Sequence, residues 1–472
     1  MAARAVTVAP TMQPADMSTV LFSFARMRYR DKVMMARLAE STPAILGSFR
    51  AADITYFLAA FARLDVQHKL VFNLFAREIA RKLHDFNAAQ LGELVYAYSR
   101  LGMRHDLLLD VLKKRLIEVV KALRPWHLAM VVNGFARLDV VDERFFTVLA
   151  SEISRKIPDF SGRPLALVAN AYAKLNVRNQ FLLEVLGDEV FRRRGELEPQ
   201  SVALTLNAYA RLRVANPVLF DYFVQDVPRR IRSFNMQSVC LVASAYAKQR
   251  RAEPTLFAKL GDFACEHAQS LYPRAMATLL YSFSEVGIRH GLLFYHAPEH
   301  VSKNVRAYSL DELAMCACAY GRFQMVHLPL FDTITSTLQS RAIVPSVGAN
   351  QRSGEEDAFQ DEPTPAGPSE LLPRVSSLVW FLEAYARLTI YEAEVLQTLC
   401  DGLAERGEEL RPPLLVQATR AAAALAYAHP GLMEMASACL VAEGAGDLAV
   451  EDLEMLAKAL EDLGAASEMS PG

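Results

Sequence analysis

Several features that would place this 472-residue chain in a common class are missing. No apolar run approaches the ~18 residues that a membrane-spanning helix needs, because Arg, Lys or Glu interrupts each one. No glycine is followed by lysine, which excludes a phosphate-binding P-loop. The six cysteines show no disulfide-framework spacing, which favours a reducing compartment. We therefore expect a soluble protein without catalytic activity or cofactor that binds no membrane and no small-molecule substrate.

One pattern of metal-ligand type is present, formed by His296, Glu299 and His300. It matches the H-x-x-E-H order of a class of zinc peptidases. Pro298 lies inside it and would kink a helix, and no third ligand is evident. We interpret the match as coincidental and predict no metal site.

The composition predicts a folded chain with a charge imbalance along its length. Hydrophobic residues make up 52% and charged residues 22%, which is enough apolar material for an extended core. Residues 341–472 hold 8 basic and 22 acidic residues, and residues 1–340 hold 43 basic and 31 acidic residues. The first part therefore attracts a polyanion, whereas the second part does not.

A four-residue segment of aromatic, small, basic and apolar residues recurs along the chain, as in Phe61-Ala62-Arg63-Leu64. We call its third residue the anchor. The ten anchors are Arg26, Arg63, Arg100, Arg137, Lys174, Arg211, Lys248, Glu285, Arg322 and Arg387. From Arg26 to Arg322 every step is 37 residues, and the last step is 65. So regular a period indicates tandem repeats of one supersecondary unit.

Apolar residues within each unit fall at helical spacing, which predicts a hairpin of helix A, ending at the anchor, and helix B. Helix A is expected to begin at an N-cap residue (Asn87, Ser161, Asn235, Ser309) or a first-turn proline (Pro125, Pro199, Pro273). The residue three before the anchor is always small, which permits close helix packing, and a large apolar residue stands nine after it. The predicted fold is an all-α, superhelical α-solenoid of 37-residue repeats.

The repeat period also predicts the domain organisation. We expect an N-terminal tail over 1–13, nine tandem repeats over 14–346 and a disordered acidic insert over 347–373, which is rich in Gly and Pro. One further repeat and a degenerate acidic helical cap should follow over 374–464, and a frayed C-terminal tail over 465–472.

The 37-residue helical hairpin with its aromatic-Ala-Arg-Leu signature resembles the heptatricopeptide repeat proteins, relatives of the pentatricopeptide and octotricopeptide families. The resemblance covers roughly residues 14–346 and 374–410. The heptatricopeptide repeat family is similar in usage to the Fas-activated serine/threonine kinase family of mitochondrial RNA regulators. The resemblance implies a mitochondrial protein that acts in RNA maturation or stability, or as a component or assembly factor of the mitochondrial ribosome. The nuclease-like RAP domain that many such proteins carry has no counterpart in the Ala-rich C-terminal region.

Two sets of side chains are candidates for binding RNA. On helix A, the positions eleven, eight, four and zero residues before the anchor are expected to share a face. This face would offer cations to phosphates and asparagines to bases of single-stranded or ribosomal RNA (Arg63, Arg100, Arg137, Lys174, Arg211, Lys248; Asn133, Asn170, Asn207). A second basic row recurs near the end of helix B (Arg155, Arg192, Arg193, Arg229, Arg230).

Both sets also have a structural interpretation. Cations in the last turn of a helix complement its dipole and its terminal carbonyls, and the asparagines could satisfy backbone groups between stacked helices. The sequence leaves these alternatives open. It favours a non-catalytic RNA-binding solenoid with ribosomal or RNA-processing proteins as further partners. The alternative is a scaffold that binds other proteins without RNA.

Overall fold

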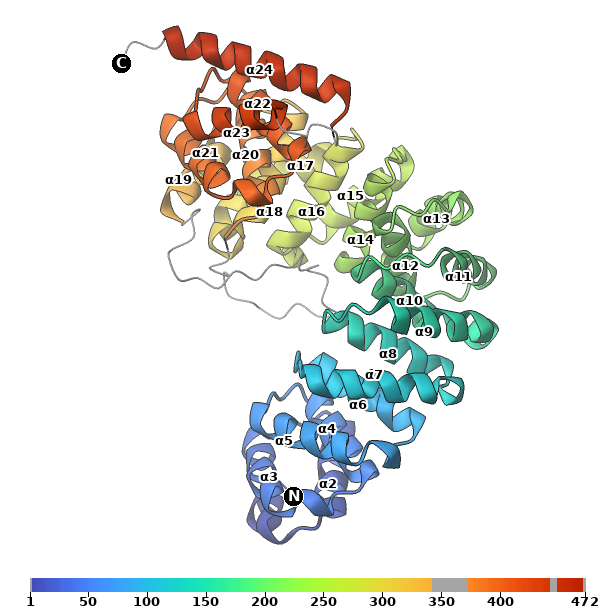
Figure 1. The fold of residues 1–472 in the computed structure, drawn as a ribbon. Helices are drawn as coiled ribbons and strands as arrows, with labels where there is room; N and C mark the ends of the chain where they lie inside the picture. The colour runs from blue at the N-terminus through green and yellow to red at the C-terminus, as the bar shows by residue number, and fades with distance from the viewer. Residues whose placement is uncertain (1, 342–371, 442–447, 470–472) are drawn as a thin grey trace. The chain divides into compact units, whose positions relative to one another are not determined.

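The computed structural model describes residues 2–341, 372–441 and 448–469, and every regular element in these ranges is a helix. The predicted all-α class is therefore confirmed. The chain divides into two compact units, residues 1–222 (unit 1) and 223–472 (unit 2), and Figure 1 labels their helices. The boundary lies inside the helix α13 Pro217–Arg230.

The helices that begin in unit 1 alternate between A and B helices from α2 onward. They are α1 Ala2–Val8, α2 Pro14–Arg26, α3 Lys32–Ile45, α4 Ala51–Arg63, α5 Lys69–Arg81, α6 Ala88–Arg100, α7 Asp106–Glu118, α8 Pro125–Arg137, α9 Glu143–Lys156, α10 Gly162–Lys174, α11 Gln180–Arg192, α12 Pro199–Arg211 and α13 Pro217–Arg230. Short 3₁₀ turns precede several A helices, among them η2 Leu46–Ser48, η4 Val120–Ala122 and η5 Ile157–Asp159.

Unit 2 continues the alternation. Its helices are α14 Met236–Lys248, α15 Pro254–Glu266, α16 Pro273–Glu285, α17 Gly291–Asn304, α18 Leu310–Arg322, α19 Leu328–Ser340, α20 Val375–Arg387, α21 Ala393–Glu405, α22 Pro412–Ala424, α23 Pro430–Val441 and α24 Val450–Met469. Each predicted anchor is the last residue of an A helix, so the repeat period located the helix ends correctly.

The A helices begin largely as the sequence predicts. Asn87 accepts a hydrogen bond from Gln90 N at 2.9 Å, and Ser309 forms a reciprocal capping box with Glu312. The prolines at 125, 199 and 273 stand in the first turn of their helices. Ser161 occupies the N-cap position of α10 as predicted, although its side chain forms no cap hydrogen bond.

Each A helix ends in a turn that reverses the chain toward helix B. The second residue after the anchor adopts a left-handed conformation, as at Asp65 (φ 51°), Gly102 (φ 62°) and Thr389 (φ 54°). The next N–H then donates to the carbonyl of the residue two before the anchor, for example from Met103 N to Tyr98 O at 2.8 Å. This hydrogen bond, the mark of a Schellman motif, recurs at the repeat period and sets the same exit from every A helix.

Helices pack on their counterparts in neighbouring repeats. In unit 1 the A helices contact in the order α2, α4, α6, α8, α10 and α12, and in unit 2 in the order α14, α16, α18, α20, α22 and α24. The small residue before the anchor permits this packing, since a Cβ added to Gly134 would stand 2.5 Å from Val95 Cγ1. α20 packs directly on α18, so the stack continues on both sides of the long break in the repeat period.

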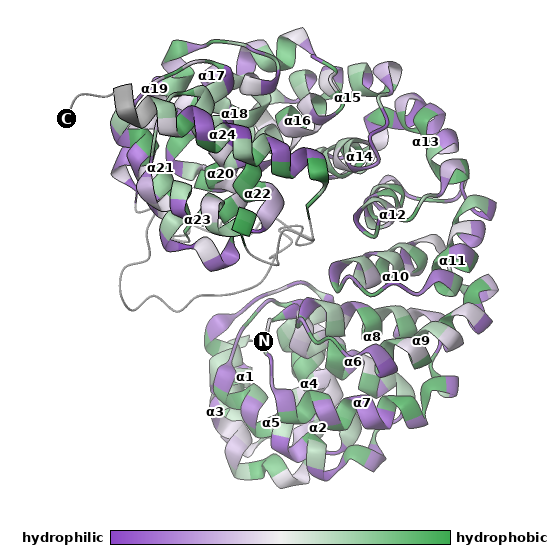
Figure 2. Cartoon of the chain, turned by 45° about the horizontal axis from the view of Figure 1, so that its top comes forward, coloured by the Kyte–Doolittle hydropathy of each residue, from purple (hydrophilic) through white to green (hydrophobic). Residues whose placement is uncertain are grey.

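Successive repeats are joined by the aromatic residue two before the anchor and the large apolar residue nine after the preceding anchor. The ring of Tyr98 on α6 lies 5.0 Å from that of Phe72 on α5, and its hydroxyl donates to Phe72 O at 2.7 Å. Tyr172 and Phe146 repeat both contacts. The prediction that the residue nine past the anchor packs on the next unit is confirmed at these joints. Figure 2 shows the resulting mixture of hydrophobic and hydrophilic residues on individual helices.

Two predicted boundaries were wrong. The expected N-terminal tail forms α1 and the turn η1 Ala9–Thr11, and both contact α3, since Ala5 and Ala9 are buried. The expected C-terminal tail is helical as far as Met469, because α24 continues past Leu463 and packs on α22 and α23. The predicted disordered insert over 347–373 lies almost wholly outside the described residues.

The helices that the structure describes include none that is both long enough and apolar enough to cross a bilayer. The superhelical curvature of the repeat array stays a prediction.

Candidate nucleic-acid interface

The accessible face of helix A consists of the anchor and the residues four, seven and eleven positions before it. We call this face the A-helix stripe. The predicted position eight before the anchor was wrong. Its alanines, Ala129, Ala166 and Ala203, are at most 1% exposed because they face the neighbouring helix. In unit 1 the exposed or half-buried charged, aromatic and amide side chains of the stripe are Phe22, Arg26, Tyr56, Arg63, Glu93, Tyr96, Arg100, Trp126, Asn133, Arg137, Arg163, Asn170, Lys174, Gln200 and Arg211.

The anchor cations of unit 1 stand at the C-terminal ends of adjacent, packed helices and so form one row. Arg63 lies 3.7 Å from the carboxylate of Glu93 on α6, and its guanidinium stands 5.1 Å from the ring centre of Phe22 on α2. Arg100 Nε donates to Ala62 O of α4 at 3.3 Å. Arg100 therefore complements the end of a neighbouring helix, which is the structural role considered for these cations. It remains only half-buried, so one position can serve both roles.

The asparagines predicted to reach bases differ in accessibility. Asn133 and Asn170 are half-buried on the A-helix stripe. Asn207 is 1% exposed, and its Oδ1 accepts no hydrogen bond from the described protein atoms. The prediction that Asn207 reaches a base was wrong, because the side chain lies inside the packed helices rather than on their surface.

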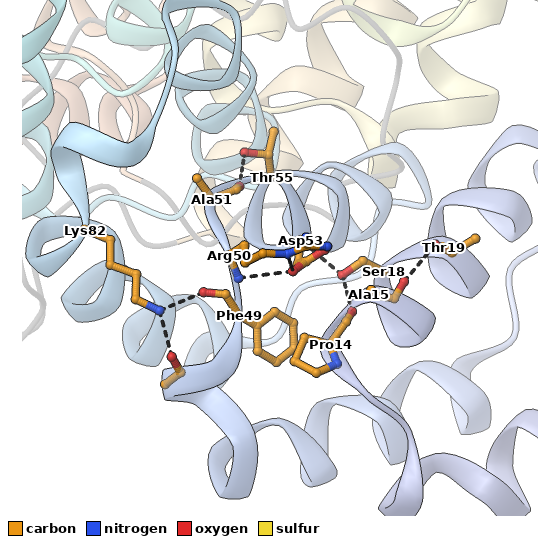
Figure 3. A network of polar contacts seen from close by, with 11 residues as sticks. Pro14, Ala15, Ser18, Thr19, Phe49, Arg50, Ala51, Asp53, Thr55 and Lys82 are labelled. Atoms are coloured by element: carbon orange, nitrogen blue, oxygen red, sulfur yellow. Dashed lines mark hydrogen bonds and ion pairs between the residues drawn. The ribbon is translucent and has the colours of Figure 1, made fainter.

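The second basic row divides into two kinds of side chain. The first cation of each pair is accessible: the side chains of Arg155 and Arg192 are both 60% exposed, and Arg229 is exposed. The second cation joins repeats. Lys82 Nζ donates to Gly47 O at 2.8 Å and to Phe49 O at 2.7 Å, at the turn before α4 (Figure 3).

Other repeats use the same position in the same way. Lys156 Nζ donates to Lys121 O and Leu123 O, and Arg193 Nη2 donates to Pro158 O at 2.7 Å. Arg193 also pairs with Glu189, and Arg230 pairs with Asp226. Arg193 and Arg230 are partly buried and have intramolecular partners, which gives them a structural role, and their binding of RNA stays a prediction.

A buried carboxylate accompanies the paired cations of unit 1. Glu152 is 6% exposed, and its oxygens accept from Arg155 at 2.6 Å and lie 2.9 Å from Lys156 Nζ. The pKa of Glu152 is lowered to about 2, first by the hydrogen bond from Arg155 and then by the hydrogen bond from Lys156 and the positive charges of both side chains. Burial of the carboxylate opposes this shift. The pKa of Glu189 is lowered in the same way by Arg192 and Arg193. Each carboxylate pairs with cations of its own helix, and the second cation of each pair, Lys156 or Arg193, joins that helix to the preceding repeat.

The two basic rows lie at opposite ends of the helices. The anchors stand at the end of helix A, and helix B runs back antiparallel, so its last turn lies beside the start of helix A. A helix of 13 residues is about 20 Å long. The rows are therefore separate features, and the anchor row is the one nearest the half-buried asparagines, whereas Trp126 stands near the opposite end of α8.

The A-helix stripe of unit 2 also pairs a cation with a carboxylate and an aromatic ring, as Arg63 does in unit 1. Lys248 is exposed at the end of α14. Arg322 forms an ion pair with Glu285 and stands 4.9 Å from the ring centre of Tyr281. That ring in turn lies 4.9 Å from the ring of Trp380 on α20. Cation, carboxylate and aromatic groups thus contact one another within the unit.

Sequence reasoning missed the aromatic members of the stripe in unit 1. Tyr56 and Trp126 are 50% and 44% exposed, and Phe22 and Tyr96 are half-buried. Aligning the repeats on the anchors and taking position seven rather than eight would have shown Tyr56, and position eleven would have shown Trp126. The shift arises because helix packing, and not spacing alone, decides which face stays accessible.

The metal-type pattern has a structural role at His300. Its Nδ1 lies 2.7 Å from the hydroxyl of Tyr308, and its Nε2 lies 3.0 Å from Leu271 O. Both ring nitrogens therefore have partners that join neighbouring repeats. The described residues include no group of three or more His, Cys, Asp or Glu side chains placed to hold a metal ion.

Residues 48–227 match the model of one protein family, described as RNA-editing substrate-binding complex 6 protein. The matched segment contains all of α4 to α12 and so includes the anchors from Arg63 to Arg211. It covers less than half of the chain, which is thus similar to this family over the repeats that carry the basic row. No curated protein shows a significant match to the chain.

Proposed function

We propose that the protein is a non-catalytic RNA-binding repeat protein and that the A-helix stripe of unit 1 is its binding surface. The observation that carries the proposal is the row of five anchor cations from Arg63 to Arg211 on adjacent packed helices. Regularly spaced cations suit the phosphates of an RNA backbone. The similarity of the same segment to a family named for RNA editing and substrate binding supports it.

The finer assignment follows the resemblance to heptatricopeptide repeat proteins. We propose a mitochondrial protein that acts in RNA maturation or stability, or in the assembly or structure of the mitochondrial ribosome, with single-stranded or ribosomal RNA as ligand. Ribosomal or RNA-processing proteins would be its other partners. This part of the proposal is supported by the description of the similar family, which names its members as proteins of a complex.

Ultraviolet crosslinking of the full-length protein to bound RNA tests this function, with Arg137→Ala, Lys174→Ala and Arg211→Ala combined in one variant. We expect the wild type to recover RNA and the triple variant to recover at least tenfold less. A matched control removes three exposed cations from unit 2, through Arg387→Ala, Arg411→Ala and Arg420→Ala. Absence of RNA from the wild type, or equal crosslinking of the two triple variants, contradicts the proposal.

A second function, a scaffold for another protein, is favoured by a different observation on the B helices of unit 1. Their second residue is apolar and 54–77% exposed in five repeats (Val33, Leu70, Leu107, Phe181, Val218). Exposed apolar side chains that recur at one repeat position are typical of a surface for a protein partner. Binding through this row should persist at ionic strengths that release RNA, because apolar contacts are not screened by salt.

A further inference from the structure

We infer that the A-helix stripe of unit 1 holds single-stranded RNA by stacking bases on an aromatic row formed by Phe22, Tyr56, Tyr96 and Trp126. The inference rests on the proposed RNA-binding function and adds the part of the ligand that is recognised. The four rings come from the consecutive A helices α2, α4, α6 and α8, one from each. No other class of group on the stripe offers such flat, accessible surface.

The rings are accessible and partly ordered by contact with each other. The side chains of Tyr56 and Trp126 are 50% and 44% exposed, so part of each ring is open to a ligand. The rings of Phe22 and Tyr56 lie 5.1 Å apart, and the guanidinium of Arg63 stands 5.1 Å from the centre of the Phe22 ring. Arg63, Phe22 and Tyr56 therefore make one continuous group of planar side chains across α2 and α4.

The position of this row relative to the anchors suits a polynucleotide. The aromatic residues stand four to eleven residues before the anchor, which places them about 6–17 Å along the helix from the cation row. Phosphates on the anchors would thus leave the bases pointing toward the rings.

The pairing of rings and cations favours single strands over duplexes. In a duplex the base faces are covered by their neighbours, so aromatic side chains reach them only where the strand is unpaired. Stacking on an aromatic side chain tolerates any base. Because Asn207 is buried, few amide groups remain to read base edges, and we expect weak sequence preference.

Three synthetic RNAs separate stacking from charge attraction: a 12-nucleotide oligouridine, an abasic ribose-phosphate 12-mer with the same number of phosphates, and a 12-base-pair duplex. Fluorescence anisotropy with end-labelled RNA and full-length protein gives each Kd. We expect oligouridine to bind about tenfold or more tightly than the abasic strand, as loss of one or two stacked bases predicts. Equal affinity for the two strands, or tighter binding of the duplex, overturns the inference.

A double variant, Tyr56→Ala with Trp126→Ala, should lose about tenfold affinity for oligouridine and keep its affinity for the abasic strand. The control is Phe181→Ala with Tyr295→Ala, which removes two exposed aromatic rings from B helices, 65% and 77% exposed. Equal effects of both double variants on oligouridine binding overturn the inference. If neither strand binds to the wild type, the proposed function itself fails.

Tryptophan fluorescence reports the stacking contact directly, since the chain has only two tryptophans, Trp126 and Trp380. In the Trp380→Phe variant all tryptophan emission comes from Trp126. We expect oligouridine to quench this emission on binding and the abasic strand to leave it nearly unchanged. Saturation with oligouridine without quenching shows that no base stacks on Trp126 and contradicts the inference while leaving RNA binding intact.

Discussion

Units 1 and 2 are built from the same hairpin, yet their A-helix stripes carry different balances of charge. On the stripe of unit 1 seven basic side chains stand with one acidic residue, Glu93. The stripe of unit 2 from α14 to α20 has four basic residues and three acidic ones, Glu285, Asp311 and Glu383. The repeat backbone therefore fixes where side chains are displayed, and the residues at those positions determine what the surface can bind.

The contrast extends to the aromatic groups. In unit 1 Tyr56 and Trp126 are 50% and 44% exposed, whereas in unit 2 the rings of Tyr281 and Trp380, 4.9 Å apart, are half-buried. A carboxylate beside a cation reduces its attraction for a phosphate, and the unit 2 stripe has three acidic residues against one in unit 1, Glu93 beside Arg63. We expect unit 2 to contribute little to RNA binding. Four experiments test this difference between the units.

The largest effect concerns salt. If unit 1 binds about five phosphates of a single strand, the Kd for oligouridine should rise about 100-fold between 50 and 200 mM salt. Removing Arg137, Lys174 and Arg211 should reduce the slope of log Kd against log salt by about 2. Anisotropy titrations measure both slopes, and the unit 2 control with Arg387, Arg411 and Arg420 changed to Ala should keep the wild-type slope. Equal slope changes for both variants would place binding equally in the two units.

Packing, unlike charge, should be equivalent in the two units. A Cβ at Gly134 would stand 2.5 Å from Val95 Cγ1, and one at Gly321 would stand 2.9 Å from Ala384 Cα. We expect Gly134→Ala and Gly321→Ala each to lower the free energy of unfolding by about 1–3 kcal/mol through overpacking. Urea unfolding followed by circular dichroism measures this, with Gly195→Ala as control because nothing lies within 4 Å of its added Cβ. A large loss at only one site would show that the units do not share one packing rule.

The unit 2 stripe should gain affinity when its one acidic anchor is reversed. Glu285→Arg supplies the cation that every other anchor position has and breaks the ion pair with Arg322. Two more cations become available to phosphates, so binding of oligouridine at low salt should tighten several-fold. The control is Glu299→Arg, the same charge change at a 64% exposed side chain on helix B. No gain over this control would mean that the unit 2 stripe fails for reasons beyond charge pairing.

The smallest effect concerns the joints between repeats in acid. Because its pKa is lowered to about 2, Glu152 stabilises the folded protein fully above its ordinary value of 4.5, and this stabilisation is lost as pH falls toward 2. The stability difference between wild type and Glu152→Gln, about 1–2 kcal/mol at neutral pH, should therefore shrink between pH 5 and pH 2. Urea unfolding at several pH values measures it, with exposed Glu143→Gln as control. A difference that stays constant with pH would exclude an ionised Glu152 at the joint.

The repeat register could be predicted closely because it depends on local rules. Each anchor is the last residue of an A helix, since a left-handed residue follows two positions later and a Schellman hydrogen bond closes the helix. The first-turn prolines have direct structural consequences within a few residues. Helix formation at both termini was missed, because α1 and the end of α24 lie outside the periodic signature and are stabilised by packing on α3, α22 and α23.

The candidate surface was predicted only in part. The anchor row was found from its period, but Arg193 had the same appearance in the sequence as Arg192. Their roles differ because one guanidinium is 60% exposed and the other reaches Pro158 O across the repeat boundary. The burial of Asn207 and the exposure of Tyr56 likewise depended on the rotation of helix A against its neighbours, whereas Phe22, Tyr96 and Trp126 stand at positions four and eleven, which spacing had already placed on this face.

The amino-acid sequence alone is sufficient to predict an array of helical hairpins with a basic residue at the end of nearly every A helix. A 37-residue period and helical spacing are properties of the chain and need no knowledge of contacts. Only the tertiary structure decided which cations remain accessible and which join repeats. The physical reason is that burial and pairing arise from residues about 35 positions apart, whose approach is set by packing between repeats.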